Sequence, residues 1–382
     1  MSASATDAVA TLAARWAWAE VDLGAIAHNV RTLAAIAAPA APWVVVKADG
    51  YGHGAVPVAR AAQGAGADGL CVALVAEGVV LREAGIDAPV LVLSEQPPEL
   101  APALVHHGLA ATVYSPGAVD ALAAAAVAAG VADHPVHVKV DTGMHRVGAA
   151  VADTGALVAR VRRAPGLRLA GVFTHLAVAD DPDDAYNARQ LDAFDAVLAT
   201  LALPEDVAVH AANSADALVH VRARRQLVRL GIAAYGLPPG PGVAAAASAL
   251  RPALSLHARV SFAKRVAGGE RVSYGLRHTF TRDSNVATVP LGYADGVPRR
   301  LFTTGGQVLI GGRRRPIVGV VTMDQLMVDC GDDPVAVGDA VVLIGRQGDD
   351  EITATEWADR LGTINYEITC GISARVPRHH LG

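Results

Sequence analysis

Three lysines, Lys47, Lys139 and Lys264, occur in a chain that holds 32 lysines and arginines together. Either residue supplies a positive charge at a surface, so a lysine that persists in an arginine-rich chain is a candidate for chemistry that needs a primary amine. An amine can lose its proton and attack a carbon atom, whereas a guanidinium stays protonated. Each lysine is therefore a candidate nucleophile, base or site of modification.

Lys47 directly follows the valines at 44–46 and precedes the run Ala-Asp-Gly-Tyr-Gly-His-Gly at 48–54. If the valines form a barrel strand, this lysine lies at the carboxyl-terminal mouth, the end that carries catalysis in such barrels. Partial burial there disfavours the ammonium and prepares the amine to attack a carbonyl carbon. The alternative is a lysine that extends from the strand end into solvent. The glycines allow close approach of a ligand, and the Tyr51 hydroxyl suits a phosphate, so we favour the chemical role.

Polar side chains also follow four later strand candidates. Alternation along 136–141 places His137, Lys139 and Asp141 on one face, where a lysine is either paired with a carboxylate or chemically modified. A single histidine at a strand end is usually structural, but groups from separate barrel strands converge on one mouth. The further candidates at these strand ends are Arg146, His175, Asn213, Ser214 and Arg229.

The elements that would position these residues alternate between short apolar runs and alanine-rich helical stretches such as 55–65, 76–84 and 190–201. Continuous apolar strands are typical of parallel sheets buried on both faces. Eight such units in about 200 residues predict a (β/α)8 TIM-type barrel, and a doubly wound sheet is less favoured because no G-x-G-x-x-G follows an early strand. The strand candidates are 43–46, 69–74, 89–93, 111–114, 136–140, 169–173, 207–210 and 226–230.

The pattern changes after Pro-Pro-Gly-Pro-Gly at 238–242, which is typical of a turn or linker. Runs of β type without clear helical spacers follow, so the sequence predicts a C-terminal mostly-β domain. These runs are 253–262, 286–291, 307–310, 316–321, 326–328 and 340–343. We expect a flexible tail at 1–15, the barrel at 16–244 and the β domain at 245–382.

Composition narrows the functional classes. Of the 382 residues, 52% are hydrophobic and 18% are charged, which excludes disorder for most of the chain. A net charge of −5 argues against a partner bound through phosphate neutralisation, such as a nucleic acid. Three widely spaced cysteines predict neither a disulfide framework nor a thiolate metal site. With no signal-peptide pattern and no strongly apolar segment, we expect a cytoplasmic protein without membrane or metal partners.

The run Val-Val-Lys-Ala-Asp-Gly-Tyr-Gly-His-Gly at 45–54 resembles the pyridoxal-phosphate attachment motif of bacterial alanine racemases. The resemblance extends in order over nearly the whole chain and implies a barrel, a β domain and a homodimer with shared active sites. His145 stands where the family usually has glycine and should crowd the loop that holds Arg146; Thr322 stands where cysteine is common. The other matching segments are 139–148, 228–236, 272–275, 291–296, 322–325, 365–367 and 375–378.

The resemblance implies that pyridoxal 5'-phosphate assists interconversion of L- and D-alanine, which supplies D-alanine for peptidoglycan. Lys47 would hold the cofactor and act as base for D-alanine, and Tyr274 of the partner subunit would act for L-alanine. A phenol of pKa about 10 costs about 4 kcal/mol to ionise at pH 7, so Tyr274 needs a positive neighbourhood. His175 and Arg229 would supply it.

The remaining roles also follow from the resemblance. Arg229 keeps its proton and leaves the cofactor ring neutral, which favours return of a proton to Cα over transamination. Arg146 would bind the cofactor phenolic oxygen and, with the backbone N–H of Met323 from the partner, the substrate carboxylate. Lys139 would be carbamylated and position Arg146. For Lys264 we find no role, and we expect it at the surface. Phosphate binding falls to Tyr51, Ser214, Tyr366 and the backbone of Gly231 and Ile232; Asn213 completes the cofactor-binding set, with Asp324 and Tyr293 in support.

Three other functions remain as alternatives. A racemase for serine or a larger amino acid would use the same fold. A cofactor-binding homeostasis protein without turnover would have no use for the β domain or for Tyr274. A decarboxylase of the same architecture would be expected to place a carboxylate beside the pyridine nitrogen, where this chain has Arg229.

Overall fold

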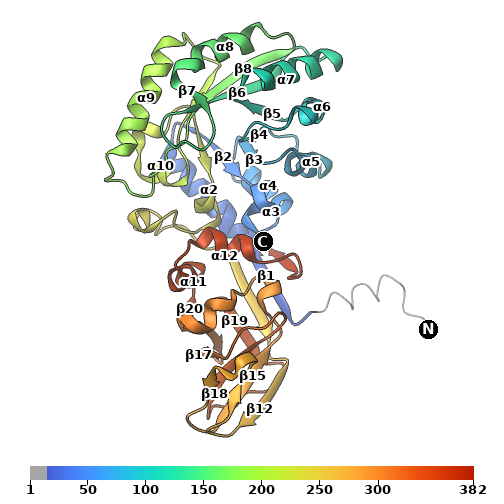
Figure 1. The fold of residues 1–382 in the computed structure, drawn as a ribbon, viewed down its shortest axis with the longest axis vertical. Coiled ribbons are helices and arrows are strands. Elements are labelled where there is room, and N and C mark those ends of the chain that lie inside the picture. Colours follow the sequence, from blue (N-terminus) through green and yellow to red (C-terminus); the bar gives the residue numbers. More distant parts are fainter. Residues whose placement is uncertain (1–14) are drawn as a thin grey trace, which may run out of the picture. The chain divides into compact units, whose positions relative to one another are not determined.

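The computed structural model describes residues 15–382, so the predicted tail at 1–15 lies, apart from Arg15, outside the described residues. The described chain forms two compact units (Figure 1). The barrel unit comprises Leu23–Arg251, and the β unit combines residues 15–22 with Pro252–Gly382.

The barrel unit contains the predicted parallel strands in the order β10-β2-β3-β4-β5-β6-β8-β9. Two backbone hydrogen bonds bring the ends of this order together: Gln226 N–H donates to the Val209 carbonyl at 3.1 Å, and Arg229 N–H donates to the Ala212 carbonyl at 3.0 Å. The sheet is thus a nearly closed barrel, which confirms the predicted fold class. The strands are β2 (Ala41–Val45), β3 (Gly69–Val72), β4 (Val90–Val92), β5 (Ala110–Val113), β6 (His134–Asp141), β8 (Leu167–Phe173), β9 (Ala208–His210) and β10 (Leu227–Leu230), with β7 (Ala149–Ala150) beside β6.

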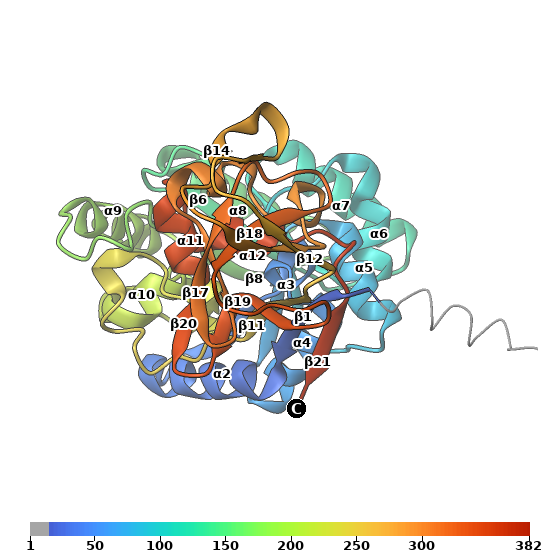
Figure 2. The same cartoon turned by 90° about the horizontal axis from the view of Figure 1, so that it is seen from below.

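Helices surround these strands, as the view in Figure 2 shows. Helix α7 illustrates how the sequence begins one of them, because Ser115 Oγ accepts a hydrogen bond from Ala118 N–H and Pro116 occupies the first turn. Helix α2 buries Ile26, Val30 and Leu33, spaced as one helical face. The barrel helices are α2 (Leu23–Ala37), α4 (Ala55–Gly64), α5 (Val75–Glu83), α6 (Ala101–His106), α7 (Pro116–Ala128), α8 (Thr154–Arg163), α9 (Tyr186–Thr200) and α10 (Ser214–Val219).

The β unit is built on a sheet in the order β12-β15-β18-β17-β16-β19-β11-β1-β21, with β20 beside β19. Neighbours are antiparallel except β1 and β21, which are parallel. The strands are β1 (Ala17–Asp22), β11 (Leu254–Arg259), β12 (Phe262–Val266), β15 (Ser284–Val289), β16 (Gln307–Ile310), β17 (Arg313–Val318), β18 (Leu326–Gly331), β19 (Ala340–Gln347), β20 (Asp350–Ile352) and β21 (Arg378–Leu381); β13 (Arg271–Val272) and β14 (His278–Thr279) form a separate hairpin.

The division of the chain differs from the predicted boundaries at two places. Residues 16–22 were assigned to the barrel, but strand β1 pairs with β11 and β21 in the β unit. Its buried residues alternate with more exposed ones, as in a sheet covered on one face, whereas the barrel strands β3, β4, β5 and β10 are buried at every position. Residues 245–251, assigned to the β domain, belong to the barrel unit.

Two helices in the β unit were not predicted, α11 (Ala354–Leu361) and α12 (Asn365–Gly371). The signal for α11 is present in the sequence, because Thr353 Oγ1 caps the helix by accepting a hydrogen bond from Glu356 N–H at 3.0 Å. This segment was assigned to the mostly-β domain because it follows a series of β-type runs, the last of them at 340–343.

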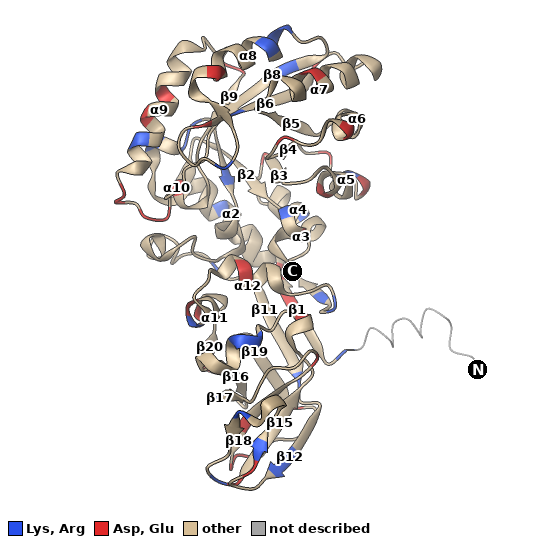
Figure 3. Ribbon diagram, viewed as in Figure 1, with Lys and Arg blue, Asp and Glu red and all other residues tan. Residues whose placement is uncertain are grey.

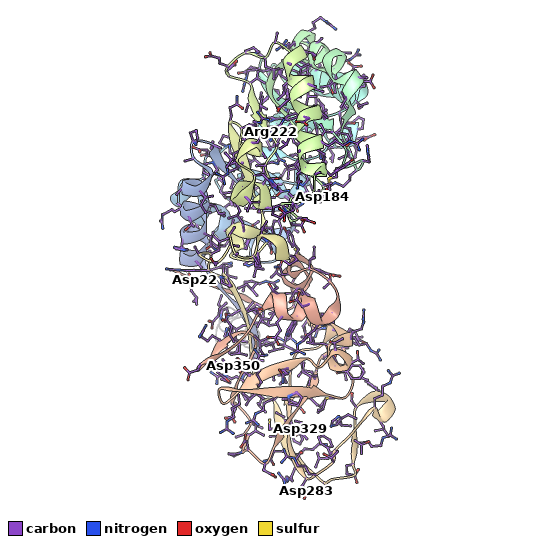
Figure 4. All side chains as sticks on the ribbon, turned by 90° about the vertical axis from the view of Figure 1, so that its left-hand side faces the viewer. Asp22, Asp184, Arg222, Asp283, Asp329 and Asp350 are labelled. Carbon is purple, nitrogen blue, oxygen red and sulfur yellow. The ribbon has the colours of Figure 1, made fainter. Side chains whose placement is uncertain are left out.

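Charged residues of both signs lie on the outer helices of the barrel unit, for example on α8 and α9 (Figure 3). Arg222 and Asp350, labelled in Figure 4, each take part in ion pairs. Arg222 contacts Asp192 at 2.6 Å and Asp195 at 2.7 Å, and Asp350 contacts Arg314 at 3.1 Å. Such partly exposed pairs contribute about 0–1 kcal/mol each. Within residues 15–382, no helix is both long and apolar enough to cross a membrane.

Candidate active site

The segment after strand β2 turns in the left-handed sense, over the element labelled α3 (Lys47–Tyr51). Ala48, Asp49 and Tyr51 have φ values of 51°, 51° and 52°, and Gly50 lies between them at 61°. A left-handed conformation costs a residue with a side chain about 1–2 kcal/mol, so surrounding contacts must enforce it. Strain concentrated directly beside Lys47 is typical of a functional site.

Three hydrogen bonds from side chains support this left-handed turn and the strand end before it. Glu77 Oε1 accepts from Ala48 N–H at 2.7 Å, and Asp49 Oδ1 accepts from Ala55 N–H at 2.8 Å. The Tyr235 hydroxyl donates to the Val45 carbonyl at 2.8 Å, at the end of strand β2. Glu77 was not predicted as a site residue, because its position in the first turn of α5 is explained by helix capping alone.

Tyr51, Ser214 and Gly231, three of the predicted phosphate-binding residues, lie together. Ser214 Oγ accepts from Gly231 N–H at 2.8 Å and from Ala233 N–H at 3.3 Å, which leaves its own proton to donate. A Cβ atom added to Gly231 would lie 2.7 Å from the Tyr51 hydroxyl, so only glycine leaves this concave corner open. Hydroxyls and backbone beside the last barrel strand match the phosphate sites of such barrels.

Asn213 and Ile232 flank this corner. The Asn213 side chain caps helix α10, since its Oδ1 accepts from Ala215 N–H at 2.8 Å and Asp216 N–H at 3.2 Å. Asn213 therefore fixes the position of Ser214, the first residue of that helix. Ile232 is buried and begins the 3₁₀ turn Ile232–Tyr235 that follows Gly231.

Arg229 lies inside the barrel with 3% of its surface exposed. Its Nη1 contacts His210 Nδ1 at 2.6 Å, and its Nη2 lies 3.2 Å from His175 Nδ1. Nη2 also donates to the carbonyls of Thr174 at 2.9 Å and Ala211 at 2.8 Å. These contacts fix the plane of the guanidinium, and the remaining N–H groups, on Nε and Nη1, have no partner among residues 15–382.

Positive charge accumulates around His175. Burial lowers the pKa of His175 well below its usual value, and the charges of Arg229, Lys139, Arg146 and Lys47 lower it further. The structure therefore brings together the cationic residues predicted from separate strand ends. A ligand with several negative groups, such as a phosphate, a phenolate and a carboxylate, suits this field, and the residues present fit pyridoxal phosphate.

Lys139 is a buried amine on strand β6. Burial lowers its pKa to about 8, with further lowering from Arg146 and Arg229. Its Nζ lies 5.6 Å from the centre of the Phe173 ring, and within residues 15–382 it forms no ion pair with a carboxylate. Of the two predicted states, paired or modified, the pairing is thus not formed in this structure.

His145 differs from the expectation that it crowds the loop. Its side chain is 78% exposed and lies 3.2 Å from Asp141 Oδ2. The backbone explains the difference, because His145 has φ 54°, a conformation that glycine adopts without strain. Arg146 follows it, exposed and without a hydrogen-bond partner among residues 15–382, so its guanidinium is available to a ligand.

The predicted residues of the β unit lie on exposed turns. Tyr274 is 73% exposed and begins a 3₁₀ turn after Ser273, whose Oγ donates to the Val320 carbonyl at 2.7 Å. Met323 is 52% exposed. Tyr293 N–H donates to the Thr322 carbonyl and Ala294 N–H to the Met323 carbonyl, each at 3.0 Å, so these turns lie side by side.

The other predicted residues of this unit have varied surroundings. Asp324 Oδ1 accepts from Arg375 Nη2 at 2.7 Å, which anchors the turn that bears Met323. Tyr366 is half-buried on helix α12, and its predicted contact with phosphate remains a prediction. Lys264 is exposed on β12, an edge strand, where a lysine also discourages pairing with another sheet.

A lysine at the mouth of a (β/α)8 barrel, within a cluster of cations and near the corner formed by Tyr51, Ser214 and Gly231, is typical of enzymes that bind an anionic cofactor covalently. A family model described as "Alanine racemase, N-terminal domain" matches residues 21–239, and one described as "Alanine racemase, C-terminal domain" matches residues 253–380. The chain therefore belongs to the alanine racemase family, whose members are pyridoxal-phosphate-dependent amino-acid racemases.

Individual proteins support the same assignment. An alanine racemase of Symbiobacterium thermophilum is 51% identical over 96% of this chain and 97% of its own length. The structure of alanine racemase from Streptomyces coelicolor A3(2) matches with a TM-score of 0.91 at 38% identity, covering 97% of this chain and 100% of that one. A histidine racemase from Leuconostoc mesenteroides matches with a TM-score of 0.88 at 28% identity, covering 97% and 99%.

Proposed function

We propose that this protein interconverts L-alanine and D-alanine, with pyridoxal 5'-phosphate attached to Lys47 and with two bases on opposite faces of the substrate. The observation that carries the proposal is the cluster of Lys47, Lys139, Arg146 and Arg229 around His175, next to the corner formed by Tyr51, Ser214 and Gly231. When bound, the cofactor withdraws the electron pair that remains at Cα after a proton leaves.

The residues of the barrel mouth would hold this cofactor by charge and by hydrogen bonds. The Ser214 hydroxyl, the Tyr51 hydroxyl and the backbone of Gly231 and Ile232 would bind phosphate oxygens, with Tyr366 as a further phenol. Arg229 would donate to the pyridine nitrogen through an N–H that its protein contacts leave unused. Because a guanidinium does not release its proton at neutral pH, that nitrogen stays unprotonated.

Two bases give the reaction its stereochemical outcome. On one face the Lys47 amine would exchange a proton with Cα of D-alanine, and on the other the Tyr274 phenol of the partner subunit would exchange one with L-alanine. His175 is neutral at pH 7 because burial and its cationic neighbours lower its pKa, so its imidazole can accept one hydrogen bond and donate another. Arg229 contacts Nδ1, which leaves the Nε2 proton to donate to the phenolate.

The substrate carboxylate would be held by Arg146 and by the Met323 backbone N–H of the partner subunit. We further propose that Lys139 is carbamylated. Its pKa of about 8 leaves roughly one amine in ten unprotonated at pH 7, and only the neutral amine attacks carbon dioxide. The new carboxylate would lie among cations and would position the Arg146 guanidinium.

A homodimer is part of the proposal, because Tyr274 and Met323 are exposed on the β unit and would act on the barrel of a second copy. We also propose a cytoplasmic location, supported by three cysteines of which none forms a disulfide, and a role in supplying D-alanine for peptidoglycan.

A racemase of broader specificity is the alternative, and the similarity to a histidine racemase favours keeping it. Turnover of L- and D-alanine, compared with both enantiomers of serine and histidine, separates the two. We expect a visible absorption band from the lysine-bound cofactor and turnover of alanine in both directions well above the others. Purified protein without vitamin B6 aldehyde, or equal rates for all three amino acids, would contradict the proposal.

A further inference from the structure

At the amino-terminal end of the barrel, opposite the mouth that carries Lys47, lies a cavity of about 390 Å³ that is partly open to solvent. Its lining residues come from the first halves of strands, among them β2, β4, β6 and β8, from the loops before strands, and from Arg82 near the end of helix α5 (Figure 1). This volume lies in the range of pockets that bind small molecules, and no residue of the proposed catalytic mechanism lines it.

Two large rings form its inner wall, and the neighbouring strands make room for them. The Trp43 ring lies where a Cβ on Gly69 would be only 2.5 Å away, and the His137 ring lies where a Cβ on Gly171 would be 2.2 Å away. The ring centres of Trp43 and His137 are 6.4 Å apart. Glycines in strand interiors otherwise weaken a sheet, so their presence here indicates space kept for these rings.

The polar groups of the cavity favour an anion. Arg82 and Arg168 line it together with Asp87, which leaves a net positive charge. The Arg82 guanidinium donates to backbone carbonyls, among them His107 at 2.9 Å and Ile86 at 2.7 Å, and so serves the fold. Arg168 is exposed and forms no hydrogen bond or ion pair with residues 15–382, so its guanidinium is available to a ligand.

His137 connects the cavity to Arg229 through His210. His137 Nδ1 lies 3.0 Å from His210 Nε2, and His210 Nδ1 lies 2.6 Å from Arg229 Nη1. A guanidinium can only donate, so His210 Nδ1 accepts and its proton resides on Nε2. Burial lowers the pKa of His137 to about 3, with further lowering by Arg168 and Arg229, and the ring is neutral.

The direction of these two hydrogen bonds determines which ring nitrogen of His137 carries the proton. Since His210 donates from Nε2 to His137 Nδ1, the single proton of neutral His137 is on its own Nε2. That N–H has no partner among residues 15–382, and His137 lines the cavity. A ligand that accepts a hydrogen bond from this N–H polarises the series of hydrogen bonds that runs through His210 to Arg229.

We propose that this cavity is a second binding site, for a small monocarboxylate with a flat apolar body, and that its occupation is sensed at Arg229 through His137 and His210. The carboxylate pairs with Arg168 and accepts from His137 Nε2–H, while the apolar body packs against Trp43 and Leu227. The coupling rests on the proposed function, in which Arg229 donates to the cofactor ring, so that binding at this distant end changes the environment of that ring.

Titration calorimetry of the holoenzyme with benzoate, and with neutral benzyl alcohol for comparison, tests the binding. We expect benzoate to bind and benzyl alcohol to bind at least about tenfold more weakly, as a lost charged hydrogen bond implies. Arg168→Ala should weaken the binding of benzoate by about tenfold. The matched variant Arg163→Ala, at an exposed position on α8, should leave the affinity unchanged.

Carboxylates can also enter the substrate site, so Arg146→Ala is the decisive control. Benzoate binding that survives Arg146→Ala but is weakened by Arg168→Ala supports the second site. Binding that is lost with Arg146→Ala and indifferent to Arg168→Ala overturns it, as does the absence of any binding, which would mean that the cavity holds water alone.

The connection to Arg229 has its own readout, the visible absorption of the lysine-bound cofactor. Benzoate should shift this band in the wild-type holoenzyme and in Arg146→Ala. In His137→Leu, which interrupts the hydrogen-bond chain, benzoate held by Arg168 should no longer shift it. Binding at the second site that leaves the wild-type band unmoved would overturn the coupling.

Discussion

The barrel unit and the β unit present their functional residues in opposite ways. In the barrel unit, Arg229 and Lys139 are buried, and the Arg229 guanidinium has protein partners on two of its nitrogens. In the β unit, Tyr274 and Met323 project from exposed turns that are held through backbone and neighbouring side chains. The buried residues of the barrel unit can form their part of a site within one subunit. The exposed residues of the β unit need a second protein surface on which to act.

The contrast predicts that changes in the β unit affect catalysis without affecting stability. Tyr274→Phe should lower racemisation by about 10²–10⁴-fold, the usual contribution of a general base, while the melting temperature stays the same. In deuterium oxide the variant should still exchange the Cα proton of D-alanine through Lys47, but not that of L-alanine. Proton NMR measures both rates.

The control is Phe262→Leu, a change at a second exposed aromatic side chain of the β unit that has no proposed role, and it should retain both exchanges. Equal loss, or equal retention, of exchange for the two enantiomers in Tyr274→Phe would show that Tyr274 does not serve one face of the substrate.

In the barrel unit, stability and catalysis should change together. Arg229→Glu removes donors to His210, Thr174 and Ala211 and places a carboxylate in their midst, so we expect a loss of about 3 kcal/mol in the free energy of unfolding. A carboxylic acid can protonate a pyridine nitrogen, so pyruvate formed by transamination should rise at least about tenfold relative to racemisation.

Denaturant unfolding and a coupled pyruvate assay report the two effects of Arg229→Glu. Arg163→Glu, at an exposed position on α8, should change the free energy of unfolding by no more than about 0.5 kcal/mol. Unchanged partitioning between pyruvate and D-alanine would contradict the role given to Arg229.

Lys139 gives a pH-dependent test of the barrel unit. Its pKa is lowered to about 8, so the neutral amine is abundant above that pH and declines about tenfold per unit below it. With ¹³C-labelled bicarbonate, a carbamate resonance should be present at pH 8 and should weaken toward pH 6. Lys139→Ala should abolish the resonance and Lys264→Arg should not; a resonance that survives Lys139→Ala would contradict the assignment.

The smallest effect concerns His145. Glycine adopts φ 54° without strain, and the exposed contact with Asp141 is weak, so His145→Gly should raise the free energy of unfolding by about 0.5 kcal/mol. His145→Ala keeps the strain and loses the contact, so it should be less stable than wild type. Thermal unfolding gives the order, and an alanine variant as stable as the glycine variant would contradict the backbone argument.

Local patterns in the sequence predicted the barrel and the strand ends that carry Lys47, Arg146, His175 and Arg229. Continuous apolar runs identify strands buried on both faces, and a polar residue at their end is conspicuous. Strand β1 escaped this pattern because only alternate residues are buried, and its partners β11 and β21 are distant in sequence. Pairing over such separations is not visible in a local window.

The sequence also did not show which site residues contact one another. His210 ended a predicted strand, but nothing in the sequence indicated its 2.6 Å contact with Arg229. Glu77 holds the turn beside Lys47 from another helix, and the exposed side chain of His145 depends on its φ angle. Residue type and spacing identified most candidates, whereas long-range geometry determined what each contacts.

Hybrid dimers test most directly whether each active site combines the barrel of one subunit with Tyr274 of the other. Two differently tagged copies, one Lys47→Arg and one Tyr274→Phe, are co-expressed and the hybrid is purified through both tags. If sites are shared, one site of this hybrid is intact and it has about half of wild-type activity. A hybrid of wild type with the double variant should then be almost inactive. The reverse, an inactive first hybrid and a half-active second one, would contradict the account.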